Sequence, residues 1–141
     1  MIKALGENQV FVFGSNSAGF HGAGSAGLAC RGESKNTWRT DPWFLNAMKS
    51  PRGSHARVGK WATYGEARGF QCGTDGKSYA IITIVRPGQR RSYPLEKIQE
   101  QIKELFEFAE HCHPEWEFIS EGAENPSPLG GWDECDPLKI V

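Results

Sequence analysis

The chain has 141 residues and a formal net charge of −1, and 38% of its residues are hydrophobic. This length suits one domain with a single core and leaves no room for a second. The sequence shows neither the apolar core of a signal peptide nor an apolar run long enough to span a membrane. We therefore expect one cytoplasmic domain over residues 1–141, with no membrane segment.

Cysteine spacing argues against disulfides and metal sites. The four cysteines lie far apart without a C-x-x-C pair, which favours reduced thiols. A cluster at 111–113 reads H-C-H, but only Cys135 adds a metal-type residue nearby, and no paired ligand spacing appears. We expect neither a metal nor a cofactor. The four cysteines are Cys30, Cys72, Cys112 and Cys135.

Charge is distributed unevenly along the chain. Residues 31–70 carry eight Lys/Arg and three Asp/Glu, whereas residues 101–141 carry two Lys/Arg and ten Asp/Glu. A basic middle section can attract phosphate ligands or nucleic acid, and an acidic C-terminal section can solubilise the protein. Solvated faces explain such charge runs more often than partners do.

A strand, a glycine-rich loop and a helix start follow one another near the N-terminus. Residues 10–13 read V-F-V-F, which is typical of a strand covered on both faces, and Gly14 is expected to end it. Asn16 follows, and the turn 21–24 (H-G-A-G) precedes a helix start at Ser25. Such a helix N-terminus favours an anion, although a purely structural turn is the alternative. The spacing matches neither the dinucleotide fingerprint nor the P-loop.

The stretch 37–57 mixes tryptophan, proline and arginine without clean periodicity. It follows the first helix, which we expect to end near Gly32. Asp41 suits the cap and Pro42 the first residue of a short helix over 43–49. We interpret 37–57 as a local elaboration of the domain, which is either a lid or partner surface or an extra packed turn.

The second half of the chain predicts a strand, a helix and a strand. Residues 79–85 are strand formers in an almost unbroken run. Apolar residues then recur at spacings of three and four from Leu95 to Ala109, which predicts an amphipathic helix that packs one face on the sheet. Residues 116–120 predict a further strand.

These motifs resemble those of macrodomains, and most closely those of small macro-like proteins of bacteria and phages. Residues 13–24 match the pattern F-G-S-N-x-x-G-x-H-G-A-G, and the glycine-rich stretch 65–76 before Ser78-Tyr79-Ala80-Ile81 is similar to a hairpin that precedes S-Y-A-I-P-T. The resemblance covers about two thirds of the chain by our judgement. It implies an α/β domain of three α/β/α layers with a central mixed sheet, and a binding site for ADP-ribose or a related nucleotide.

The resemblance also implies site residues. Asn16 would meet the distal ribose, and the backbone of 22–25 would surround the diphosphate. Gly122 matches the first glycine of a second loop, but 125–128 read N-P-S-P, and prolines lack the N–H groups that a phosphate needs. Trp132 either stacks on the ligand or plugs the sheet edge. The expected ligand-binding set is Asn16, His21, Gly22, Ala23, Gly24, Ser25, Gly122 and Trp132.

No spacing fixes a catalytic group. A hydrolase needs to activate water, and the candidates are His21, as a general base of near-neutral pKa, and the carboxylates Glu66 and Asp75. We therefore expect binding of ADP-ribose or a related nucleotide, with ADP-ribosyl hydrolysis as the alternative. A further alternative is a protein- or nucleic-acid-interaction module that has lost the ligand. Three tryptophans among Lys/Arg residues permit it, whereas a pI near 6.4 disfavours a dedicated nucleic-acid binder.

Overall fold

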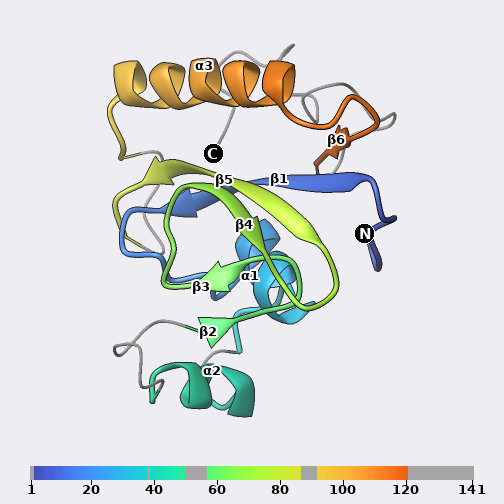
Figure 1. The fold of residues 1–141 in the computed structure, drawn as a ribbon. Coiled ribbons are helices and arrows are strands. Elements are labelled where there is room, and N and C mark those ends of the chain that lie inside the picture. The colour runs from blue at the N-terminus through green and yellow to red at the C-terminus, as the bar shows by residue number, and fades with distance from the viewer. Residues whose placement is uncertain (1, 38, 50–56, 87–91, 121–141) are drawn as a thin grey trace.

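The computed structural model describes residues 2–37, 39–49, 57–86 and 92–120. Its helices and strands follow one another along the chain as shown in Figure 1. In order they are β1 (Gln9–Asn16), α1 (Gly24–Arg31), α2 (Pro42–Ala47), β2 (Arg57–Val58), β3 (Thr63–Tyr64), β4 (Gly69–Cys72), β5 (Lys77–Ile84), α3 (Leu95–His111) and β6 (Glu117–Ile119).

A mixed sheet forms the centre of the described residues. Its strand order is β4-β5-β1-β6, and β2 pairs with β3 in a separate antiparallel ladder. Strands β5 and β6 both run parallel to β1, whereas β4 pairs antiparallel with β5 as the other half of a hairpin. The prediction of an α/β protein with a mixed sheet is therefore confirmed.

Strand β1 extends further at its carboxyl end than the sequence predicted. The ladder to β5 runs through Gly14, which pairs with Ile81, and reaches Asn16, which pairs with Ile84 after a shift in register. The predicted end at Gly14 is wrong because pairing with a neighbouring strand holds this glycine in an extended conformation. At the other end, residues 2–6 carry no regular structure, although Ile2 packs on the core.

Helix α1 ends, and helix α2 begins, where the sequence predicts. Helix α1 ends at Gly32, whose φ of 73° is left-handed and whose N–H donates to Leu28 O. Helix α2 has Asp41 as its N-cap, because a carboxylate oxygen of Asp41 accepts from Trp43 N at 2.9 Å. It ends at Ala47, two residues before the predicted end.

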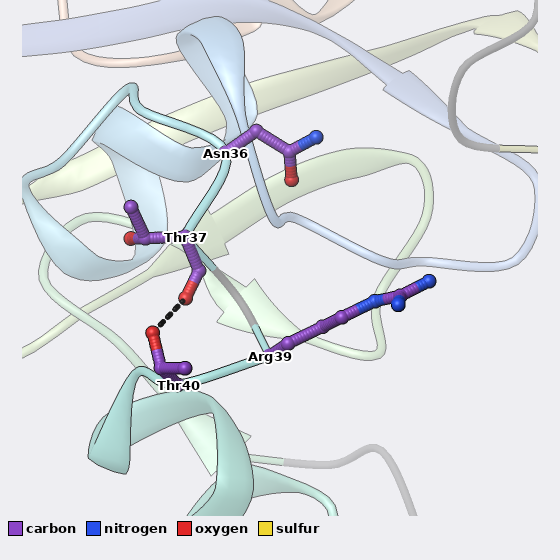
Figure 2. A pocket seen from close by; sticks show the side chains of 4 residues that line it. All are labelled: Asn36, Thr37, Arg39 and Thr40. Carbon is purple, nitrogen blue, oxygen red and sulfur yellow. Dashed lines mark hydrogen bonds between the residues drawn. The ribbon is translucent and has the colours of Figure 1, made fainter.

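A tight turn precedes α2. Thr40 N donates to Thr37 O at 3.1 Å, and Thr40 Oγ1 lies 3.4 Å from the same oxygen (Figure 2). This turn lies between α1 and the Asp41 cap of α2.

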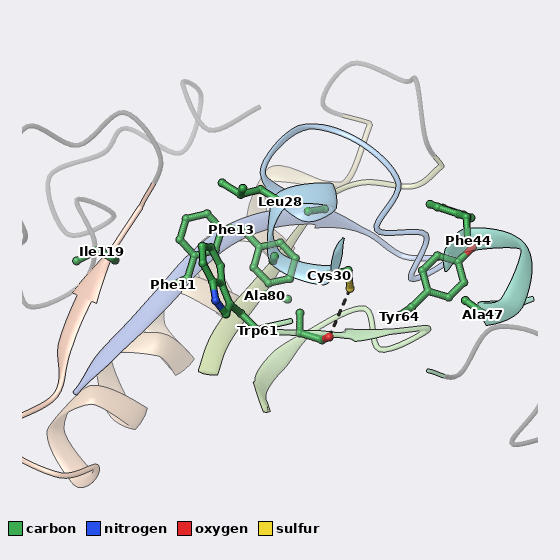
Figure 3. Packing of buried hydrophobic residues seen from close by; sticks show 13 residues of the cluster. Phe11, Phe13, Leu28, Cys30, Phe44, Ala47, Trp61, Tyr64, Ala80 and Ile119 are labelled. Carbon is green, nitrogen blue, oxygen red and sulfur yellow. Dashed lines mark hydrogen bonds between the residues drawn. The ribbon is translucent and has the colours of Figure 1, made fainter. Parts of the chain in front are cut away.

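The alternation of side chains along β1 divides the core into two clusters. Val10 and Val12 pack with α3, whereas Phe11 and Phe13 pack with α1 and with Trp61 (Figure 3). Figure 1 shows α3 and α1 on opposite sides of the sheet. The V-F-V-F run is buried on both faces, as predicted.

Helix α3 confirms the amphipathic prediction, with one addition. Ile98, Ile102 and Leu105 are buried against the sheet, as expected. Gln101 is also buried, since its side-chain amide accepts from Ile82 N at 2.7 Å and donates to Ile82 O at 2.9 Å. Strand β4 begins at Gly69, opposite Ala80, so Gln101 satisfies backbone groups of β5 that β4 does not reach.

The described residues were compared with the requirements for a membrane-spanning helix and for a metal site. Among them, no helix combines the length and apolar character that crossing a membrane requires. The same residues contain no group of three or more His, Cys, Asp or Glu side chains that would hold a metal ion. Cys30, Cys72 and Cys112 are free thiols, and Cys135 lies outside the described residues.

Candidate functional site

The topology of the sheet marks one place for a ligand. Strands β5, β1 and β6 are parallel, so their carboxyl ends meet at one edge of the sheet. The chain leaves β1 over the face that carries α1, whereas the connection from β5 to β6 passes over the face that carries α3. In open α/β sheets, ligands bind at the carboxyl ends of the strands where the connections change direction. Here that point lies between the adjacent strands β1 and β5.

The glycine turn at the start of α1 lies at this edge. Its N-cap, Ala23, has no side-chain oxygen to offer, and the first turn of the helix carries no acidic residue. Gly24 N donates to Ser34 O at 2.9 Å, and Gly27 N donates to Ala23 O at 3.0 Å. Ser25 and Ala26 lie between these two residues, and their N–H groups have no acceptor within the described part of the chain. The described residues leave both N–H groups without a partner, and Ala26 itself is buried.

Open space lies beside Gly24. Ala23 and Gly24 are exposed, and Ser25 is half-buried. Gly24 has a φ of 61°, and a Cβ built on it would meet no atom within 4 Å. Its left-handed backbone favours glycine, and the empty volume beside it leaves room for a bound group.

Arg31 fixes the turn from behind. Its Nη2 donates to Gly22 O at 2.7 Å and also to Lys35 O, while its Nη1 pairs with a carboxylate oxygen of Asp41. The Arg31 side chain is only 2% exposed. A single buried guanidinium therefore joins the glycine turn, the segment after α1 and the cap of α2. This role could not be predicted from the sequence, because a cation such as Arg31 in the last turn of a helix is already explained by the helix dipole.

Helix α2 packs directly on the turn. A Cβ on Gly22 would lie 3.0 Å from Phe44 Cζ, so a side chain at this position would press on the buried ring. Phe44 also meets Tyr64 edge to face, with ring centroids 4.9 Å apart. The glycine at position 22 thus serves packing against the elaboration.

Asn16 closes the loop that follows β1. Its Oδ1 accepts from Phe20 N at 3.1 Å, and its Nδ2 donates to Phe20 O at 2.8 Å. The side chain is buried, since the residue is 4% exposed. Both polar ends of the amide are therefore engaged within the protein. The expected contact of Asn16 with a ribose remains a prediction.

His21 lies in an aromatic environment. Its ring meets Phe13 and Tyr64 edge to face, with centroids 5.3 and 6.4 Å away, and is fully buried. Its Nε2 donates to Glu66 O at 2.8 Å. Burial lowers the pKa of His21 to about 4, which differs from the near-neutral value expected of a general base. In this geometry His21 joins two loops.

The structure brings Glu66 to the site edge. Gly65 N donates to Gly19 O at 3.0 Å, and Ser15 Oγ donates to Ala67 O. The carbonyl of Glu66 also accepts from Gln71 Nε2 at 2.7 Å. Residue 66 is exposed, so its carboxylate lies in solvent beside the loop that carries His21.

Asp75 lies at the opposite end of the sheet. Asp75 lies two residues before Lys77, which pairs with Val10 near the amino end of β1. The N–H of Asp75 donates to Lys60 O. At about 3.3 Å per residue, the strand separates this end from Asn16 by about 20 Å. Asp75 is therefore not brought together with the glycine turn. Gly122 and Trp132 lie outside the described residues.

Comparison with known proteins adds no relative. The chain matches no family model, no curated protein and no solved structure. The class that its own geometry defines is an α/β protein with helices and a mixed parallel and antiparallel sheet.

Proposed function

We propose that this protein binds ADP-ribose or a related nucleotide, with the diphosphate at the N-terminus of α1. One observation carries the proposal, namely the uncapped start of this helix at the carboxyl edge of the sheet, where the N–H groups of Ser25 and Ala26 have no acceptor among the described residues. Helix N-termini bind phosphate because their free N–H groups and the helix dipole both favour negative charge.

The surroundings suit such a ligand. The open volume at Gly24 allows a phosphate to approach the backbone, and the hydroxyl of Ser25 adds a donor at the same turn. We further propose that the whole domain has the three-layer macro-like arrangement. The opposite placement of α1 and α3 supports this arrangement. Asn16 acts in this proposal by shaping the loop from 16 to 20.

Calorimetric titration with ADP-ribose, AMP and NAD tests the proposal, with Gly24→Val as the site variant. Valine at a φ of 61° is strained and fills the open space, so we expect ADP-ribose affinity to be lost. Gly69→Val is the matched control, because Gly69 has a φ of 88°, is equally open and lies on β4. Equal affinity of both variants for ADP-ribose would overturn the proposal.

A second candidate function is hydrolysis of an ADP-ribosyl bond. The exposed carboxylate of Glu66 favours it, because the side chains of Ser15, His21 and Gln71 donate hydrogen bonds to the carbonyl groups of residues 66 and 67 and hold this loop beside β1. A carboxylate there can accept a proton from an attacking water. Release of ADP-ribose from modified protein should fall in Glu66→Gln and persist in Asp75→Asn. Equal rates in the two variants would exclude Glu66 as the base.

A further inference from the structure

Helix α2 and strand β2 carry an exposed apolar surface. Among the described residues, four large hydrophobic side chains are 38% to 46% exposed, and three of them are Leu45, Met48 and Val58. Leu45 lies on α2, Met48 is the C-cap of this helix, and Val58 ends β2. We propose that these three residues, with Lys49 and Arg57, form a docking surface, the α2 face, for helix α3 of a second copy of the protein.

Arg57 joins strand β2 to helix α2. Its Nη1 donates to Trp43 O at 3.3 Å, and its Cζ lies 5.1 Å from the centroid of the Trp43 ring. Figure 1 shows β2 beside α2. Phe44, on the same helix, is buried in the core, so α2 turns one face inward and leaves Leu45 and Met48 exposed. The apolar groups and the cation therefore belong to one side of the domain.

The two cations of the α2 face lack carboxylate partners. In the described part of the chain, neither Lys49 nor Arg57 takes part in an ion pair. The carboxylate at the start of α2, that of Asp41, is already engaged by Arg31 and by the backbone of the helix. Exposed apolar groups beside two such cations are complementary to an acidic protein surface.

Helix α3 offers an acidic surface of this kind. Glu96, Glu100 and Glu107 are exposed and are spaced by four and seven positions, so they lie on one face of the helix. Lys103 lies among them, and this α3 face thus carries three carboxylates and one cation. Figure 1 shows α3 and α2 on opposite sides of the described domain. The two faces can therefore meet only between two copies of the protein.

Nucleic acid and membranes fit the α2 face less well. Single-stranded nucleic acid favours exposed aromatic rings on which bases stack. The exposed apolar residues here have no rings, and the guanidinium of Arg57 lies over Trp43. Anionic membranes favour clusters of about four to eight cations, whereas the α2 face has Lys49 and Arg57. A protein surface is the occupant that both the charge and the apolar groups favour.

Contact between two different faces is heterologous. Each copy that docks through its α2 face keeps a free α3 face, so further copies can add until a ring closes. The apolar part of the α2 face is small, which predicts a weak contact that salt screening weakens further. The proposal is independent of the nucleotide site at the start of α1.

Sedimentation velocity at rising protein concentration tests the proposal. We expect the average mass to rise above the 15.6 kDa of one chain and to return towards this value at high salt. Lys49→Glu and Glu107→Lys should each stay monomeric. Lys3→Glu is the control, because it makes the same change in charge at an exposed residue outside both faces.

An equimolar mixture of Lys49→Glu and Glu107→Lys gives the sharper test. The reversed α2 face of one variant then meets the reversed α3 face of the other, so we expect association to return. A native protein that is monomeric at every concentration would overturn the proposal, as would a mixture that stays monomeric. Binding of monomeric protein to phosphatidylserine vesicles or single-stranded DNA that Lys49→Glu abolishes would also overturn it.

Discussion

Arg31 and Asp41 form an ion pair that joins the end of α1 to the start of α2. Their side chains are 2% and 19% exposed, so solvent screens the pair only weakly. The same guanidinium holds Gly22 O, which places the pair directly behind the glycine turn.

Breaking this pair is expected to be costly. Arg31→Met leaves Asp41 without its cation and Gly22 O without its donor, so we expect the free energy of unfolding to fall by about 3 kcal/mol. Urea denaturation measures it. Asp41→Asn keeps an N-cap oxygen and should cost less than Asp41→Ala by about 1 kcal/mol. A double-mutant cycle that shows no coupling between the two positions would contradict the role of the pair.

The buried imidazole of His21 predicts a dependence of stability on pH. Its pKa is about 4 in the folded protein, and the ordinary value of 6.5 applies when the chain is unfolded. Between these values the unfolded state binds more protons, so stability is full above pH 6.5 and falls as the pH drops towards 4. The total loss is about 3 kcal/mol.

Urea midpoints at several pH values between 7 and 4 check this prediction. His21→Gln should show a flatter pH profile, whereas the exposed His111→Gln should keep the native slope. A native profile as flat as that of His21→Gln would show that the imidazole is not the group that titrates.

The hydrogen bonds of Gln101 to Ile82, a residue of β5 that β4 does not reach, can be tested by substitution. Gln101→Leu removes both hydrogen bonds to Ile82 and leaves buried backbone groups unsatisfied, so we expect a loss of about 2 to 3 kcal/mol. Hydrogen exchange at Ile82 N–H should also accelerate. Gln99→Leu is the matched control, because Gln99 is exposed on the same helix. Equal stability of the two variants would contradict a stabilising role for the hydrogen bonds between Gln101 and Ile82.

The thiols should differ in reactivity. Burial raises the pKa of Cys30, and this residue is fully buried, whereas Cys72 is exposed. In a Cys135→Ser background, we expect a thiol reagent to modify Cys72 first and Cys30 only after denaturant is added. Mass spectrometry of peptides identifies the order. Early modification of Cys30 would show that the hydrophobic cluster around this residue opens readily.

Local sequence patterns predicted the elements well where the signal was itself local. The spacing of Ile98, Ile102 and Leu105 predicted both the helix and its buried face, and Asp41 with Pro42 predicted a capped helix. Gly14 misled the prediction because pairing with β5 outweighs the tendency of glycine to end a strand.

Contacts between distant residues could not be read from the chain. His21 meets Glu66 across 45 positions and Gln101 meets Ile82 across 19, so neither burial follows from the neighbouring residues. Of the candidate site, the glycine turn was predictable as a helix start. That Ser34 would accept from Gly24 N, and Arg31 would hold Gly22 O, depends on how the elaboration folds back.

The pairing of β1 with β6 has a consequence for synthesis of the protein. Strand β1 leaves the ribosome well before β6, and β6, one of its two parallel neighbours, ends only at Ile119. Glu117 N also donates to Asn8 O at 2.7 Å, so this contact joins residues that lie far apart in the sequence. Pairing between strands so distant in sequence is slow to form. The edge of β1 that pairs with β6 therefore stays unpaired until β6 has been translated.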